Sequence, residues 1–334
     1  MCIHEWVPEA LVEFVPKPEP QARLAARSFQ IDLKARAWWL SSYSALSYGG
    51  ANTAPETPNE MNTLEGARES DADTQDAQVR PNKPQRGEGR IHHLPKGAGP
   101  GTFLHTLLED AAEVGFAKVA HAPTELAALL DQRVNSASWQ DYRPALADWL
   151  AQYLAVPLPL ASGTFSLAEL TTYKAEPEFW FEARQVNTAA IDAQINQHIQ
   201  PGAARPALAL THLNGMLKGF IDLVFEHQGR YYVADYKSNW LGHTDMDYSH
   251  AAMRKKILAS RYDLQYVIYT LALHKLLKSR LGDAYDYDTH MGGAVYLFLR
   301  GHHADTRGAF FDRPPRVLIE TLEQLFLAQG AEHA

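Results

Sequence analysis

Three charged residues, Asp222, Asp235 and Lys237, lie in or beside two short apolar runs of the chain. The runs, residues 220–225 and 231–236, are rich in aromatic and β-branched side chains and flank a polar turn, so the pattern predicts a β-hairpin. Side chains alternate between the two faces of a strand, which puts Asp235 and Lys237 on one face. We expect Asp222 to meet them at one end of the hairpin.

These residue types indicate metal-dependent chemistry on phosphate. Two carboxylates that face each other repel unless a cation lies between them, and hard divalent cations such as Mg²⁺ prefer oxygen ligands. A bound metal ion can polarise a phosphoryl oxygen and lower the pKa of a water, while a neighbouring ammonium can orient that water. Phosphodiester hydrolysis requires such a set. The spacing alone also fits a surface hairpin with an exposed Asp–Lys ion pair, which contributes little stability.

The sequences GFID, residues 219–222, and DYKS, residues 235–238, resemble the metal-binding core of the PD-(D/E)xK nuclease superfamily. The surrounding run GMLKGFIDLVFEHQGRYYVADYKSNWLG resembles the branch in which the nuclease is joined to a DNA helicase. The resemblance implies an α/β fold with a restriction-endonuclease-like core, in which a central mixed β-sheet is flanked by helices. One departure from the superfamily pattern is Ile221, which stands where a proline precedes the first aspartate in other members.

The resemblance also implies a set of site residues. Asp222 and Asp235 would hold Mg²⁺, with Mn²⁺ able to substitute, and Lys237 would position or activate the attacking water. A histidine on a helix is more often structural than catalytic, but GTFLHTLLE is similar to the helix that supplies a histidine to such sites, so His105 would be a metal ligand. The main-chain carbonyl of Tyr236 would be a further ligand.

Two more features of the site follow from the resemblance. A glutamate at the start of a strand joins the metal site, and Glu178 matches that place best, with Glu176 and Glu182 as alternatives. Gln265 and Tyr269 are four residues apart and share one face of a predicted helix. They match a Gln-x-x-x-Tyr motif that is implied to help hold the active site and the DNA backbone, although an ordinary interfacial contact would have the same spacing.

The elements that must position these residues follow from hydrophobic spacing. Apolar periodicity predicts helices over residues 102–114, in two pieces across 123–154, and over 260–280 and 317–327. Residues 294–299 form a compact apolar run that indicates another strand of the same sheet. The helix over 260–280 has five aliphatic side chains for its buried side: Leu264, Val267, Ile268, Leu271 and Leu276.

The chain divides into three parts by composition. The helix-like and strand-like pieces in residues 1–50 do not add up to an independent hydrophobic core. The sequence SSYSALSYGG at the end of this segment resembles the junction where the helicase portion of such enzymes ends. Residues 51–90 are dominated by polar residues, Pro and Gly, so burial cannot offset the entropy of ordering them, and we expect a flexible linker. Residues 91–334 form the expected nuclease domain.

Composition restricts the class of protein. A chain of 334 residues with 46% hydrophobic residues can bury a substantial core. Its apolar runs are too short to span a membrane and its N-terminus lacks a secretion signal, so we expect a cytoplasmic protein without a membrane partner. Cys2 is the only cysteine, which excludes an intrachain disulfide and a four-cysteine iron–sulfur site. This favours the helicase-linked branch over relatives that carry an iron–sulfur cluster.

The charge of the chain bears on its partners. A net charge of −8 is unusual for a protein that binds nucleic acid unaided, because Lys and Arg supply most non-specific affinity for phosphate. A basic group, Arg254 to Lys256 with Arg261, could follow a DNA strand or form a solvated helix face. The resemblance implies DNA as substrate, with the helicase portion, two further subunits of a helicase–nuclease and a recombinase as partners.

Function is therefore expected to be that of a DNA hydrolase of the exonuclease type. The glycine-rich run over residues 96–102 lacks the Gly-Lys-Ser/Thr ending of a phosphate-binding loop, so this chain carries no recognisable ATPase motor. Two alternatives remain. One is a catalytically silent docking module that contacts the recombinase or a partner subunit, and the other is a standalone nuclease of the same superfamily that acts in defence.

Overall fold

The computed structural model describes residues 39–42, 46, 91–135, 137–208 and 212–327. The expected helicase-like segment over residues 1–50 therefore lies outside the described residues except for Trp39–Ser41, Ser42 and Leu46, and the expected linker over 51–90 lies outside them entirely.

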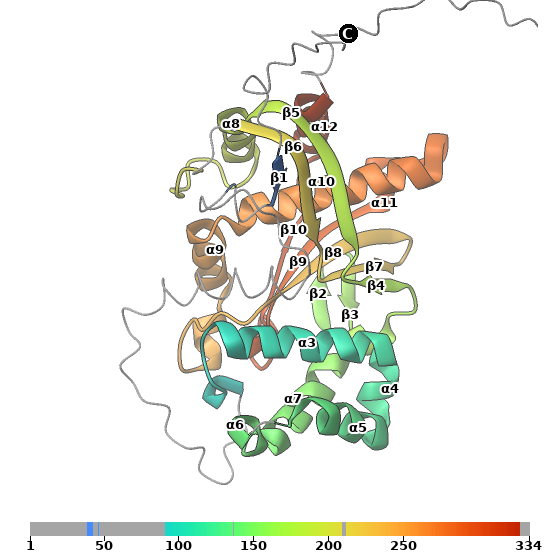
Figure 1. The fold of residues 1–334 in the computed structure, drawn as a ribbon, viewed down its shortest axis with the longest axis vertical. Helices are drawn as coiled ribbons and strands as arrows, with labels where there is room; N and C mark the ends of the chain where they lie inside the picture. Colours follow the sequence, from blue (N-terminus) through green and yellow to red (C-terminus); the bar gives the residue numbers. More distant parts are fainter. Residues whose placement is uncertain (1–38, 43–45, 47–90, 136, 209–211, 328–334) are drawn as a thin grey trace, which may run out of the picture. The chain divides into compact units, whose positions relative to one another are not determined.

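The hairpin predicted from the sequence forms, and it lies inside a five-stranded mixed sheet (Figure 1). The turn between its strands consists of Gln228 and Gly229, both with positive φ, as a type I′ turn requires. In spatial order the strands of this sheet are β10 (Ala309–Asp312), β9 (Met291–Phe298), β8 (Arg230–Lys237), β7 (Leu223–His227) and β4 (Tyr173–Ala175). β9 runs parallel to β8, and the other neighbours are antiparallel.

The prediction for the first strand of the hairpin was wrong at its start. Phe220 ends the preceding strand β6 (His212–Phe220), and β7 begins only at Leu223. Ile221 and Asp222 lie between the two strands, so Phe220, Asp222 and Val224 do not belong to one strand face. The apolar run continues through this bend, and hydrophobicity alone therefore does not mark the change of sheet.

A second sheet continues from the bend. β6 pairs antiparallel with β5 (Glu178–Asn187) and parallel with β1 (Trp39–Ser41). Trp39 is in register with Gly215, so a short segment of the N-terminal region adds a strand to this sheet. A small hairpin is formed by β2 (Leu158–Leu160) and β3 (Gly163–Phe165).

Helices cover both faces of the five-stranded sheet, and each face has its own hydrophobic core. Alternation along β8 sends Tyr232, Ala234 and Tyr236 into one core and Val233 into the other. The first core contains residues of α3 (Ala98–Val114), α4 (Phe116–His121), α5 (Pro123–Arg133) and α7 (Arg143–Ala155). The second contains residues of α8 (Thr188–His198), α9 (His250–Ala259), α10 (Tyr262–Leu281) and α12 (Arg316–Leu327). The expected α/β architecture is confirmed.

The remaining elements are short. Two further helices are α6 (Ala137–Gln140) and α11 (Tyr287–His290). Tight 3₁₀ turns are η2 (Ile91–His93), η3 (Leu167–Glu169), η4 (Asp245–Tyr248), η5 (Gly282–Ala284) and η6 (Leu299–Gly301). None of the helices in the described part of the chain combines the length and the apolar character needed to cross a membrane.

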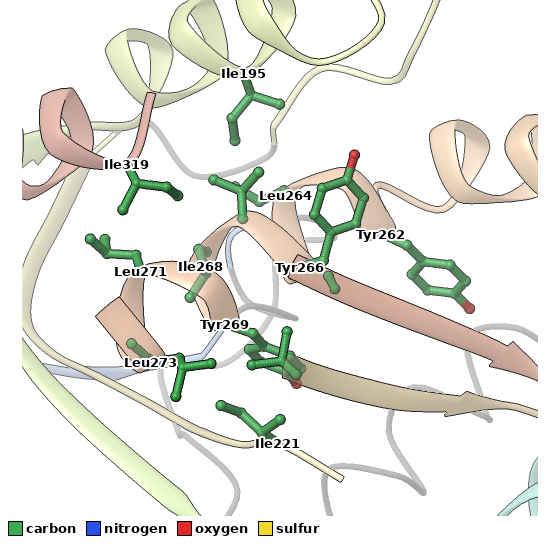
Figure 2. Packing of buried hydrophobic residues seen from close by; sticks show 14 of the residues in the cluster. Ile195, Ile221, Tyr262, Leu264, Tyr266, Ile268, Tyr269, Leu271, Leu273 and Ile319 are labelled. Atoms are coloured by element: carbon green, nitrogen blue, oxygen red, sulfur yellow. The ribbon is translucent and has the colours of Figure 1, made fainter. Parts of the chain in front are cut away.

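The long helix α10 confirms the helix predicted over residues 260–280. In Figure 2, Leu264 and Ile268 on α10 face the region of Ile195 on α8 and Ile319 on α12. The prediction of a buried Leu276 was wrong, because that side chain is 47% exposed near the C-terminal end of the helix. The aliphatic spacing continues past the point at which the neighbouring elements stop covering the helix.

Candidate functional site

The bend before β7 and the end of β8 place the three charged residues at the same end of the hairpin. Leu223 is in register with Ala234, so Asp222 enters the hairpin next to Asp235. Asp235 and Lys237 share the face of β8 that turns toward the α10 core, since they alternate with Tyr236.

Asp222 is fixed by the opposite strand and by helix α3. Its Oδ2 accepts a hydrogen bond of 2.6 Å from the backbone N–H of Tyr236 and lies 3.4 Å from Nδ1 of His105. Both side chains are mostly buried, and the His105 ring meets the Tyr236 ring edge-on. The structure thus brings His105 and Asp222 together, although they come from distant parts of the chain.

Asp235 and Lys237 form a buried ion pair. The ammonium Nζ lies 2.7 Å from Oδ2 of Asp235, and each side chain is less than 5% exposed. Two charges withdrawn from water require close partners, because the desolvation cost of each is several kcal/mol. The exposed ion pair that the spacing also allowed is therefore not what forms.

A small pocket adjoins Asp222. Its lining residues come from α3, from the end of β4 and from the hairpin: His105, Leu108, Glu109, Ala175, Glu176, Asp222 and Tyr236. Burial raises the pKa of Glu176 to about 9, with a hydrogen bond to Glu109 and the negative charges of Glu109 and Asp222 acting in the same direction. Carboxyl groups thus crowd one another in this pocket.

The three glutamates considered from the sequence have different surroundings. Glu176 lines the pocket, and its backbone N–H donates to the carbonyl of Asp222 at 3.0 Å. Glu178 is exposed and pairs with Lys218 at 2.9 Å, and this hydrogen bond lowers the pKa of the Glu178 carboxyl. Glu182, the third alternative, is exposed and pairs with Arg184 at 2.6 Å. Of the three carboxylates, the structure brings only that of Glu176 to the pocket.

The chemistry of the pocket fits a divalent cation. Among the described residues, no group of three or more His, Cys, Asp or Glu side chains is already arranged around a metal position. Mg²⁺, however, usually keeps several waters and binds through one or two carboxylates. The carboxyls of Glu176 and Asp222, with the imidazole of His105 beside them, supply suitable donors. A cation would offset both the burial and the neighbouring negative charges that raise the Glu176 pKa.

Gln265 and Tyr269 lie inside the protein. Gln265 Nε2 donates to the Tyr269 hydroxyl at 3.1 Å, and both side chains are at most 1% exposed.

The basic residues that were grouped from the sequence do not share one surface. Arg254 and Lys255 are exposed on α9, while Arg261 is buried in ion pairs with acidic residues. Grouping Arg261 with a solvent-facing basic surface was wrong.

Several residues around the site were not found from the sequence. Glu109 follows His105 by four positions on α3, so helical spacing could have placed both on one face. Tyr262 and Tyr296 surround Lys237, and Arg300 binds the carbonyl of Ser238, but no spacing rule connects these residues with the motif.

A mixed sheet with helices on both faces, an aspartate before one central strand and Asp-x-Lys at the end of the next define a restriction-endonuclease-like nuclease fold. Residues 85–332 match the model of the PD-(D/E)XK nuclease superfamily, and the chain belongs to this superfamily. Nucleases of this superfamily use divalent metal ions.

Within this superfamily, the chain is similar to RecB proteins. RecBCD enzyme subunit RecB of Escherichia coli (strain K12) is 39% identical over 246 residues, which cover 73% of this chain and 20% of that protein. RecB of Haemophilus influenzae is 37% identical over 243 residues, covering 72% of this chain and 19% of that protein. RecB of Mycolicibacterium smegmatis is 30% identical over 362 residues, covering 98% of this chain and 32% of that protein. The chain thus spans a third or less of the length of these relatives.

Proposed function

We propose that this chain is the nuclease module of a RecBCD-type helicase–nuclease and that it hydrolyses phosphodiester bonds of DNA, as an enzyme of the exodeoxyribonuclease V type. The observation that carries the proposal is the buried Asp235–Lys237 ion pair on either side of Tyr236, the residue that lines a pocket together with Asp222 and His105. A docking module would have no need to bury charged groups in this arrangement. The similarity to RecB supports the same proposal.

Mg²⁺ is the proposed metal ion, with Mn²⁺ able to substitute. A bound divalent ion supplies a polarised phosphoryl oxygen and a water of lowered pKa. Asp222 and Asp235 would hold it through their carboxylates, with His105 and the main-chain carbonyl of Tyr236 as further ligands. A glutamate would complete the set, and its position in the pocket supports Glu176 over Glu178.

Lys237 has the second chemical role in this proposal. Its ammonium would orient the attacking water and stabilise the negative charge that develops on the phosphoryl oxygens. The contact of 2.7 Å with Asp235 holds the ammonium at the end of β8. Gln265 and Tyr269, which are buried, would support the site from within the protein rather than touch the DNA backbone.

The proposed partners follow from the relatives and from charge. A chain with net charge −8 has little non-specific attraction for the phosphates of DNA. We propose that the RecB helicase portion, with RecC and RecD, delivers the DNA to it. The biological role would then be the processing of double-strand breaks for homologous recombination in the cytoplasm, with a RecA-type recombinase as a further partner.

The test is cleavage of linear single-stranded DNA by the purified chain in low salt with Mg²⁺, with and without EDTA. The variant is Asp235→Ala, and the matched control is Asp283→Ala, which removes an exposed carboxylate from the turn η5. We expect metal-dependent degradation by the wild type and the control, and a loss of about 100-fold or more in Asp235→Ala.

An inactive wild type would require a second step, in which RecC and the helicase portion are added. Cleavage restored by the motor, and absent with Asp235→Ala, supports the proposal. No cleavage with the motor and either metal would overturn it in favour of a catalytically silent docking module for RecA or RecC. Full activity without the motor, together with no binding to RecC, would indicate a standalone nuclease in defence.

A further inference from the structure

The Lys237 ammonium is buried, and a carboxylate alone does not define its position. Its side chain is 3% exposed and lies 2.7 Å from Asp235. A lysine has a flexible four-carbon stem and an ammonium that bonds in several directions, so several neighbours together define where the ammonium lies. The other neighbours of the ammonium must therefore limit where it can lie.

Two tyrosine rings are among those neighbours. Nζ of Lys237 lies 4.0 Å from the centre of the Tyr262 ring and 5.5 Å from that of Tyr296. Both distances are within the range of about 6 Å over which an aromatic face attracts a cation, and the attraction is strongest when water is excluded. The two ring centres are 5.8 Å apart, and both tyrosines are 1% exposed. The ammonium therefore has a carboxylate and two aromatic rings as neighbours.

The secondary structure fixes the backbone positions of both tyrosines. Tyr262 is the first residue of α10, and its hydroxyl donates to Oδ1 of Asn239 at 3.4 Å, two residues past Lys237. Tyr296 is on β9 in register with Asp235, the partner of Lys237 in the ion pair. The two rings thus approach the ammonium from two elements that pack against the end of β8.

A hydrogen-bond chain then fixes the Tyr296 ring. Its hydroxyl donates to Oε1 of Gln265 at 2.7 Å, and Nε2 of Gln265 donates to the Tyr269 hydroxyl at 3.1 Å. The Gln-x-x-x-Tyr pair is therefore linked to Lys237 through Tyr296. Because both members of the pair are buried, a contact with DNA does not explain this arrangement.

We propose that Tyr262 and Tyr296 form an aromatic cage that holds the Lys237 ammonium beside Asp235, and that Gln265 and Tyr269 act on the site by fixing Tyr296. The four residues are positioning residues, since they act through Lys237. The cage is a contact geometry, and only its kinetic consequence rests on the proposed nuclease function.

The first test is spectroscopic and does not depend on metal or activity. In the full chain labelled with ¹³C at the lysine ε position, protons held above an aromatic face resonate upfield, and the Lys237→Arg variant assigns the signal. We expect an upfield ε-methylene resonance in the wild type that persists in Tyr262→Phe and moves toward the position of exposed lysines in Tyr262→Leu, where only the more distant Tyr296 ring remains. An unshifted Lys237 signal in the wild type, or a shift of the same size in a folded Tyr262→Leu protein, would overturn the cage.

The second test is kinetic and compares ring loss with hydroxyl loss. With single-stranded DNA and Mg²⁺, Tyr262→Leu should lower kcat by about 10- to 100-fold, as misplacement of a reacting group does, and leave KM within about threefold. Tyr262→Phe should stay within about threefold of the wild type, because it keeps the ring. Replacement of Gln265 by Met should also lower kcat, through Tyr296.

A matched control separates the cage from general destabilisation. Leu271→Ala removes a fully buried side chain from the same helix, at a cost of roughly 2–5 kcal/mol, without touching the cage. At a temperature where every variant is folded, Leu271→Ala should keep kcat. An unchanged kcat in Tyr262→Leu, or an equal loss in Leu271→Ala, would contradict a positioning role. An inactive wild type would overturn the proposed function, and the lysine spectra would still decide the cage.

Discussion

Nε of Arg300 donates a hydrogen bond of 3.0 Å to the main-chain carbonyl of Ser238, one residue beyond Lys237. Its two terminal nitrogens donate to three more main-chain carbonyls, those of Ile91, Leu94 and Pro95. Burial lowers the pKa of this guanidinium. A single side chain therefore ties the segment that leads into α3, the helix of His105, to the end of the strand that carries Lys237.

We predict that Arg300→Met destabilises the protein by roughly 3 kcal/mol or more, because it leaves several buried carbonyls without a donor. Arg300→Lys should recover only part of this free energy, since an ammonium cannot reproduce the planar fork of a guanidinium. Urea unfolding measures both values. The control is Arg307→Met, at an exposed arginine in the next turn, with an expected change of about 0.5 kcal/mol or less. Equal effects at the two arginines would contradict the prediction.

The two glutamates near the site should differ in their effect on metal binding. Glu176→Gln should weaken binding of the metal ion by about 10- to 100-fold, a range seen when polar groups that support a metal site are removed. Glu178→Gln should change it by less than about threefold, because Glu178 pairs with Lys218. The measurement is the Mg²⁺ concentration that gives half-maximal cleavage, together with the rise in melting temperature on adding Mg²⁺. The reverse order of effects would favour Glu178 as the ligand.

The hairpin and α10 could be predicted because their signals are local. The strand that ends at Lys237 and the helix from Tyr262 to Leu281 show their periods in consecutive residues. The wrong start of the first strand has a physical reason as well. The apolar run continues through the bend at Phe220 and Ile221, so it gives no sign that one strand ends there. The change from one sheet to the other is set by pairing partners far away in the chain.

The rest of the site could not be predicted because it depends on tertiary contacts. Nothing in the sequence around Tyr296 indicates that its ring faces Lys237, since the two residues meet only through parallel pairing of β8 with β9. The choice between Glu176 and Glu178 likewise depends on which residue ends β4 and which begins β5. A shift of two residues keeps the same strand face, so alternation cannot decide it.

The glycine of the GFID motif is explained by a close approach. A Cβ atom at Gly219 would lie 2.6 Å from Cζ of Phe179, whose ring also meets Tyr269 edge-on. We predict that Gly219→Ala costs about 1–3 kcal/mol, as overpacking of a core does. Adding Phe179→Leu should recover part of that loss, which a double-mutant cycle in urea measures.

The control for this prediction is Gly99→Ala. An added Cβ at Gly99 meets nothing within 4 Å, and the residue lies in the first turn of α3, where alanine is the better helix former. Its stability should be unchanged or higher by up to about 1 kcal/mol. A Gly219→Ala protein as stable as Gly99→Ala would show that the Phe179 ring yields without cost.

His302 gives the protein a dependence of stability on pH. Burial lowers the pKa of His302 to about 3, with the neighbouring charges of His303, His92 and Arg307 acting in the same direction and Asp245 in the opposite one. The unfolded chain therefore binds a proton at His302 from about pH 6.5 downward, while the folded state does not. Its contribution to stability is present above pH 6.5 and is lost as the pH falls toward 3.

We predict that the stability difference between the wild type and His302→Gln changes by roughly 1–2 kcal/mol from pH 7 to pH 5, with the wild type losing more. Urea unfolding at several pH values in that range measures it. His303→Gln, at the exposed neighbour, should leave most of the pH dependence of the wild type in place, because burial is the larger cause of the low His302 pKa. If His302→Gln loses as much stability as the wild type between pH 7 and 5, then His302 takes up its proton in the folded state, and the burial of its ring does not set its pKa.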